Sequence, residues 1–248
     1  MSNNIYIKIF LFILLIIFSS LRLFAQSDDP VVKKSAATVK EFVPAGWKII
    51  YNAKGDLNKD LLPDEALIIE NTNPKNIIKN DEMGSNTLNT NPRKLLVLFK
   101  SKAGYALVAE NSSFIPAESS LESRCLEDPL SETGAIFITK GLLSLSFQYF
   151  FSCGSWEVIN NDYTFRYQNN QMELIGADNR SYHRASGEKD ETSSNFSTFK
   201  QSNTTGGNMF GKKDSPKTKW LQLKRRKLIA LQNITDNTFE QFMDQGRP

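Results

Sequence analysis

Hydrophobic and polar residues alternate with a period of two along much of this chain. In residues 163–168, three aromatic residues alternate with three polar ones, which is the pattern of a strand with one buried face. Apolar or alternating runs predict strands at 47–51, 66–70, 94–100, 105–109, 135–139, 142–151, 156–168, 171–178, 192–200 and 218–223. We therefore expect a mainly β fold, an antiparallel sheet or sandwich of short strands.

Turns, loops and small helices fill the remaining sequence. Gly104 and the pair Asn169-Asn170 suit tight hairpin turns, because these residues tolerate the left-handed backbone. Apolar spacing predicts a short N-terminal helix over 35–42, and Phe239, Phe242 and Met243 predict a C-terminal one. Polar composition with few large apolar residues predicts flexible loops near 71–93 and 201–217.

The N-terminus has the pattern of a secretory signal peptide. Lys8 precedes an apolar stretch over 9–18, which is too short to span a bilayer, and Ala25 is a small residue at a plausible cleavage point. We expect residues 1–25 to be removed, which leaves no stable membrane span; an uncleaved anchor is the alternative. The mature chain, 26–248, is then one periplasmic or secreted β-rich domain.

Charge and cysteine content narrow the class of protein further. The formal net charge is +3, and removal of Lys8 and Arg22 leaves +1, so the net charge selects no partner. We expect no nucleic-acid partner because the protein is expected to be exported. The two cysteines, Cys125 and Cys153, both fall in the exported part. An oxidising compartment makes a disulfide between them plausible, and two buried free thiols are the alternative.

An acidic loop lies between the first two predicted strands. Residues 55–65 read Gly-Asp-Leu-Asn-Lys-Asp-Leu-Leu-Pro-Asp-Glu, which places side-chain oxygens at Asp56, Asn58, Asp60 and Asp64. Alternate residues of a curled segment can direct their oxygens at one hard cation, and Ca²⁺ takes six to eight oxygen ligands. The alternative is an Asx-rich turn whose side chains bind its own backbone N–H groups.

This loop resembles those of FG-GAP and VCBS type repeats, in which an Asp-x-Asx-x-Asp-x3-Asp segment joins two strands and binds calcium. The resemblance implies that Asp56, Asn58, Asp60 and Asp64 supply side-chain oxygens and that Leu62 supplies its carbonyl. Together with the hairpin over 156–175 and the stretch 192–196, the chain also resembles a group of uncharacterised exported bacterial proteins. Two departures weaken the match: Leu61 stands where such loops have Gly, and Leu67 stands where an EF-hand has Glu.

Other catalytic or ligand-binding patterns are weak. His183 is the sole histidine, and the pairs Glu122 with Asp128 and Asp178 with Glu188 would serve glycoside hydrolysis only if they faced each other. A basic run over 212–227 contains Trp220; it suits either an anionic ligand or the protection of an edge strand.

The sequence therefore predicts a non-enzymatic exported module, with calcium as a possible stabilising ion. Its partner is an unidentified envelope or extracellular ligand. The alternative is a hydrolase that acts on an extracellular or envelope polymer through paired carboxylates.

Overall fold

The computed structural model describes residues 30–130, 135–211 and 215–235. By its internal contacts the chain divides into residues 1–31 and residues 32–248, and every element below belongs to the second unit. The predicted signal peptide over 1–25 and the predicted C-terminal helix lie outside the described residues. Among the residues that are described, no helix is long and apolar enough to cross a membrane.

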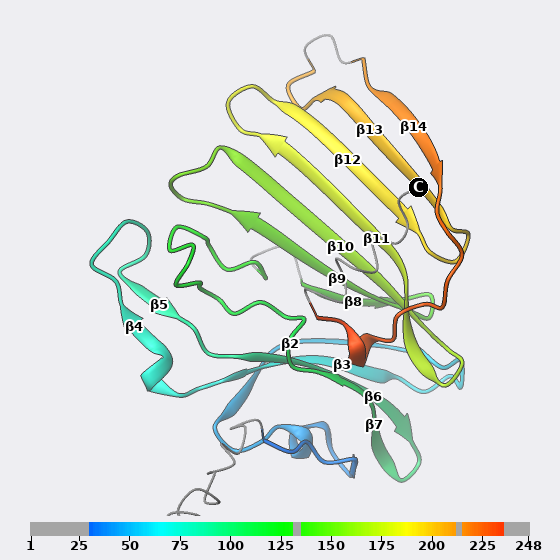
Figure 1. The fold of residues 1–248 in the computed structure, drawn as a ribbon. Coiled ribbons are helices and arrows are strands. Elements are labelled where there is room, and N and C mark those ends of the chain that lie inside the picture. Colours follow the sequence, from blue (N-terminus) through cyan, green and yellow to red (C-terminus); the bar gives the residue numbers. More distant parts are fainter. Residues whose placement is uncertain (1–29, 131–134, 212–214, 236–248) are drawn as a thin grey trace, which may run out of the picture. The chain divides into compact units, whose positions relative to one another are not determined.

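Antiparallel strands dominate the described chain (Figure 1). A five-stranded sheet has the order β1-β7-β6-β3-β2 and a seven-stranded sheet the order β14-β13-β12-β11-β10-β9-β8. The first contains β1 (Ser35–Ala36), β2 (Trp47–Gly55), β3 (Asp64–Asn71), β6 (Arg93–Ser101) and β7 (Gly104–Asn111). The second contains β8 (Ile136–Thr139), β9 (Leu142–Phe150), β10 (Glu157–Gln168), β11 (Gln171–His183), β12 (Glu188–Asn195), β13 (Lys200–Asn208) and β14 (Lys217–Gln222). The mainly β, antiparallel prediction is confirmed.

The five-stranded sheet is buried on both faces at its centre. On β3, Ala66 and Ile68 belong to one core cluster, whereas Leu67 and Ile69 belong to a second. A continuous apolar run is therefore needed here, because alternation would leave one face polar. The second cluster is completed by Phe42, from the 3-10 helix η1 (Val39–Phe42).

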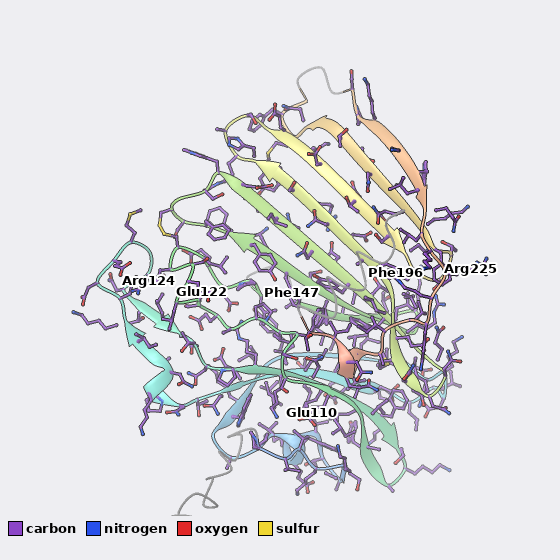
Figure 2. All side chains as sticks on the ribbon, in the orientation of Figure 1. Glu110, Glu122, Arg124, Phe147, Phe196 and Arg225 are labelled. Atoms are coloured by element: carbon purple, nitrogen blue, oxygen red, sulfur yellow. A yellow bond between two sulfur atoms is a disulfide. The ribbon has the colours of Figure 1, made fainter. Side chains whose placement is uncertain are left out.

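The first core cluster also takes side chains from the seven-stranded sheet. Leu145 of β9 and Phe165 of β10 are fully buried in it, with Phe147 (Figure 2). Gly55, at the end of β2, also lies against the seven-stranded sheet. A Cβ at this position would lie 2.4 Å from Ile138 Cγ2 of β8, so only glycine allows this approach.

The N-terminal helix predicted over 35–42 is mostly absent. Ser35–Ala36 pairs with β7 instead, and only the single turn η1 follows. The backbone N–H of Thr38 donates to Glu41 Oε1 at 3.0 Å, which caps that turn. Pro44 follows two residues after the turn, and proline suits a chain that leaves a helix.

Both stretches predicted to be loops contain regular structure. Residues 71–93 include the 3-10 helix η2 (Pro74–Asn76) and a hairpin of β4 (Ile77–Lys79) and β5 (Thr87–Asn89). Residues 200–208 form β13, so the prediction of a loop over 201–217 is wrong there. Composition misled in the first case because polar side chains supply hydrogen bonds there: Asn80 Nδ2 donates to the carbonyls of Met83 at 3.1 Å and Ser85 at 2.9 Å.

The 192–200 stretch, predicted to be an edge strand, also differs. Its first residues belong to β12, which lies inside the sheet between β11 and β13, and the edge is β14. The 3-10 helix η3 (Leu231–Asn233) is held by Asn111, whose Nδ2 donates to the carbonyls of Leu231 and Ile234 at 2.7 Å each.

Candidate functional site

The acidic loop connects β2 to β3, as predicted, and its side-chain oxygens accept backbone N–H groups. Asp56 Oδ1 accepts from Lys59 at 2.6 Å and Asp56 Oδ2 accepts from Leu61 at 3.0 Å. Asn58 Oδ1 accepts from the Asp60 N–H at 2.9 Å. The loop is therefore a series of Asx turns, the arrangement that the sequence left open as an alternative to calcium.

Two residues of this loop have a left-handed backbone. Lys59 and Leu61 both have φ of 68°, although neither is glycine. Leu61 is also 90% exposed, so no packing of its side chain explains the conformation. An L-residue in this region costs about 1–2 kcal/mol, which the turn offsets with hydrogen bonds to Asp56. The backbone thus adopts left-handed positions here without glycine.

Asp64 differs from Asp56 and Asp60 in that its side chain is buried. It begins β3 and is fully buried; Oδ2 accepts from the Leu57 N–H at 2.8 Å and Oδ1 from the Lys100 N–H at 2.9 Å. Burial raises the pKa of Asp64, against the opposing effect of these hydrogen bonds. Asp64 therefore ties the loop to β6.

Calcium would have to share these oxygens with the backbone. An ionised carboxylate offers about four lone-pair sites, so an oxygen that accepts one N–H can still bind a cation. Asp56, Asn58 and Asp60 fit that role in the exposed part of the loop. Within the described ranges, however, no three His, Cys, Asp or Glu side chains are grouped closely enough to hold a metal ion.

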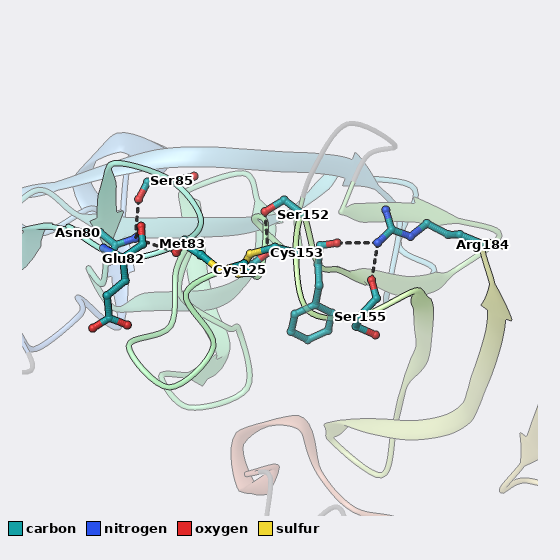
Figure 3. The surroundings of a disulfide bond; sticks show 10 residues. Asn80, Glu82, Met83, Ser85, Cys125, Ser152, Cys153, Ser155 and Arg184 are labelled. Carbon is teal, nitrogen blue, oxygen red and sulfur yellow. Dashed lines mark hydrogen bonds between the residues drawn. A yellow bond between two sulfur atoms is a disulfide. The ribbon is translucent and has the colours of Figure 1, made fainter.

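The predicted disulfide between Cys125 and Cys153 is confirmed (Figure 3). Its Cα atoms are 5.3 Å apart, and it joins the segment before residue 131 to the connection between β9 and β10. Beside it, the Ser152 N–H donates to the Cys125 carbonyl at 2.8 Å. Arg184 Nη2 donates to the Phe151 carbonyl at 2.9 Å and to the carbonyl of Ser155.

The other residues considered from sequence are not brought together as catalytic groups. Asp128 is bound by Arg93, with Nη1 to Oδ1 at 2.7 Å. Asp178 is opposite Ser193, which lies five residues along β12 from Glu188, or about 17 Å. His183 Nδ1 accepts the Ser186 N–H at 3.1 Å in the turn after β11.

A pocket of about 680 Å³ lies on the face of the seven-stranded sheet that turns away from the core. Leu145 and Phe165 point to the core, so by alternation Ser146, Asn160 and Asp162 point to the other face. We call the pocket the sheet groove. Its side chains include Ser146, Gln148, Asn160, Asp162, Arg180, Tyr182, Lys189, Asp190, Glu191 and Thr204, with Phe137 and Met209 as apolar members.

Strand register explains why these side chains gather. Directly opposite one another on five successive strands are Gln148, Asn160, Arg180, Glu191 and Thr204. Gln148 Nε2 donates to Asn160 Oδ1 at 3.0 Å. Asp162 accepts from Ser146 Oγ and from Arg180 Nη2. The groove is thus lined by a polar row that crosses five strands, and side-chain hydrogen bonds join its β9, β10 and β11 parts.

Sequence reasoning missed this groove, although a signal for it exists. The same period of two that marks the buried positions leaves Ser144, Ser146 and Gln148 on the second face of β9. The polar residues of β9 to β13 are aligned only by the register between the strands, which is not visible from one strand.

Part of the basic run lies on an edge strand, the position that its second expected role requires. Lys217 and Lys219 are exposed on β14, which is the edge of the seven-stranded sheet. Exposed charge at an edge opposes pairing with other sheets. Trp220, also on this strand, is 68% exposed.

The described residues form three antiparallel sheets with one disulfide. No known protein family, curated protein or solved structure matches the chain.

Proposed function

We propose that this chain is an exported, non-enzymatic binding module whose ligand site is the sheet groove. The groove carries the proposal: it has the volume of a ligand site, in the usual range of about 300–1,000 Å³, and is lined by convergent polar groups. The ligand belongs to the envelope or the extracellular medium. Calcium, in this proposal, stabilises the acidic loop and plays no part in ligand binding.

Two features support export. The first is the N-terminal pattern of Lys8, an apolar core and Ala25. The second is the Cys125–Cys153 disulfide, because disulfides persist in oxidising compartments and are rare in the cytosol.

Export is tested by cell fractionation and intact-mass measurement of the chain produced with a C-terminal tag. We expect a periplasmic or medium fraction in which residues 1–25 are missing. A chain that starts at Gln26 is the matched control and should stay in the cytosol. Uncleaved protein held in the membrane fraction would contradict the proposal.

Binding is tested by co-sedimentation of the mature protein with isolated bacterial envelopes. We expect saturable binding that Arg180→Gln weakens, because Arg180 lies in the groove. Arg166→Gln is the control, since Arg166 lies on the neighbouring strand β10, on the same face of the sheet as Arg180, but outside the groove lining. Equal binding by both variants would remove the groove from the proposal.

A further inference from the structure

The sheet groove presents hydrogen-bonding groups that the described part of the protein leaves available. Asn160 uses its Oδ1 to accept from Gln148, which leaves the two Nδ2–H donors of Asn160 and the Oε1 acceptor of Gln148. The Tyr182 hydroxyl and the Glu191 carboxylate also line the groove. Both donors and acceptors therefore line the groove.

Charges in the groove are nearly balanced and lie close to opposite charges. Asp162 is paired with Arg180 on the neighbouring strand. Arg180 is in turn opposite Glu191, and Lys189 is adjacent to Asp190 on β12. A phosphate or sulfate ligand needs an excess of cationic donors, and a basic peptide needs an excess of carboxylates. Neither excess is present, which favours a neutral ligand.

Apolar surface is available beside these polar groups. Phe137 is 44% exposed and Met209 is 48% exposed, and both line the groove together with the Tyr182 ring. The face of an aromatic ring carries negative potential and attracts the C–H hydrogens of a sugar ring. A ligand that combines many hydroxyls with C–H faces matches both kinds of surface.

The groove is long enough for more than one sugar unit. Its polar row extends from β9 to β13, which is four interstrand spacings, or about 19 Å. We infer that the sheet groove binds a neutral oligosaccharide. This inference rests on the proposed function as a binding module and specifies its ligand class.

The test uses the disulfide-bonded mature protein and isothermal titration with a fixed set of probes. These are the hexasaccharides of cellulose, amylose, xylan, mannan and chitin, with inorganic phosphate and a heparin hexasaccharide as charged probes. We expect saturable binding of at least one neutral hexasaccharide. Asn160→Ala should weaken it about five- to tenfold, since one or two hydrogen bonds are lost.

Asn161→Ala is the matched control, because Asn161 is the next residue of β10 and faces the other side of the sheet, where it accepts from Asn179 Nδ2 at 2.7 Å. It should bind like the wild type. Failure of all five neutral probes, or equal effects of both variants, overturns the saccharide inference. If the saccharide inference fails but the groove binds envelopes or a charged probe, the proposed binding module still stands. If the groove binds none of these probes, both the saccharide inference and the proposed function are overturned.

Discussion

Arg93 and Asp128 form a two-point ion pair in which Nη1 lies 2.7 Å from Oδ1 and Nη2 lies 2.8 Å from Oδ2. The Arg93 side chain is only 2% exposed, and its Nε donates to the equally buried Glu70 at 2.8 Å. Burial opposes the charge of Arg93, but the bonds to Asp128 and Glu70 raise its pKa above the ordinary value. The pair therefore links the five-stranded sheet to the segment that carries Cys125.

Asp128→Ala should destabilise the protein by about 2–3 kcal/mol. Removing one partner of a buried pair costs roughly 3–5 kcal/mol, and the partial exposure of Asp128, 28%, reduces that figure. Urea unfolding of the oxidised protein measures the change. Asp81→Ala breaks the exposed pair with Lys79 and should cost less than about 1 kcal/mol. Equal losses of unfolding free energy in the two variants would show that the Arg93–Asp128 pair stabilises the fold no more than an exposed pair does.

Glu173 predicts a specific acid sensitivity. It is 2% exposed, and burial alone would raise its pKa. Hydrogen bonds from Gln168 at 2.6 Å and Gln171 at 2.7 Å, with Asn169 and the charge of Lys227, lower the pKa below its ordinary 4.5. A lowered pKa stabilises the fold above pH 4.5, and this stabilisation is lost as the pH falls through the folded-state pKa.

Glu173→Gln should therefore flatten the acid limb of the stability curve. At pH 7 we expect the variant to be less stable than the wild type, and the gap should close as the pH falls below 4.5 and through the folded-state pKa of Glu173. Urea midpoints at several pH values measure this. Glu157→Gln, at an exposed site on β10, serves as the control. A constant gap at all pH values would mean that Glu173 does not titrate as proposed.

The disulfide should matter only when it is formed. Cys125 and Cys153 are separated by 28 residues, for which chain entropy gives roughly 3–4 kcal/mol. Cys125→Ser should lower the melting temperature of the oxidised protein, and reductant should lower the wild type to the same value. A full titration of free thiols in oxidised wild type would contradict the prediction.

Local features of this fold were predictable from sequence because they depend on neighbouring residues. Asn169 and Asn170, with φ of 52° and 60°, form the expected turn between β10 and β11. Pairs that depend on distant residues were not predictable. Nothing near Arg93 in the chain marks its partner Asp128, 35 residues away.

The candidate site divides in the same way. Asp56, Asn58 and Asp60 form one loop because seven residues, 56–62, contain their side chains and the amides they bind. Asn160, Arg180 and Glu191 come together only through the register of three strands. That register follows from which faces are buried, which one sequence does not show completely.

Leu61→Gly should stabilise the acidic loop without any metal. Leu61 has a φ of 68° that glycine adopts freely, so about 1–2 kcal/mol of strain is removed, against roughly 0.4–1 kcal/mol for the extra freedom of the unfolded chain. We expect a net gain of about 0.5–1 kcal/mol by urea unfolding in EDTA. Lys102→Gly is the control and should give no such gain, since Lys102 is not among the residues with positive φ.

Calcium should stabilise the native protein if the loop binds it. For a dissociation constant of about 10⁻⁴–10⁻⁵ M, 1 mM calcium raises the free energy of unfolding by about 1.4–2.7 kcal/mol. Asp60→Ala should abolish this gain, because Asp60 supplies a side-chain oxygen of the exposed loop, whereas Asp81→Ala should keep it. Thermal unfolding in EDTA and in calcium measures both. If calcium stabilises neither the wild type nor Leu61→Gly, the loop is a strand connection held by its own Asx hydrogen bonds. The backbone strain of its left-handed residues is then offset by those hydrogen bonds alone.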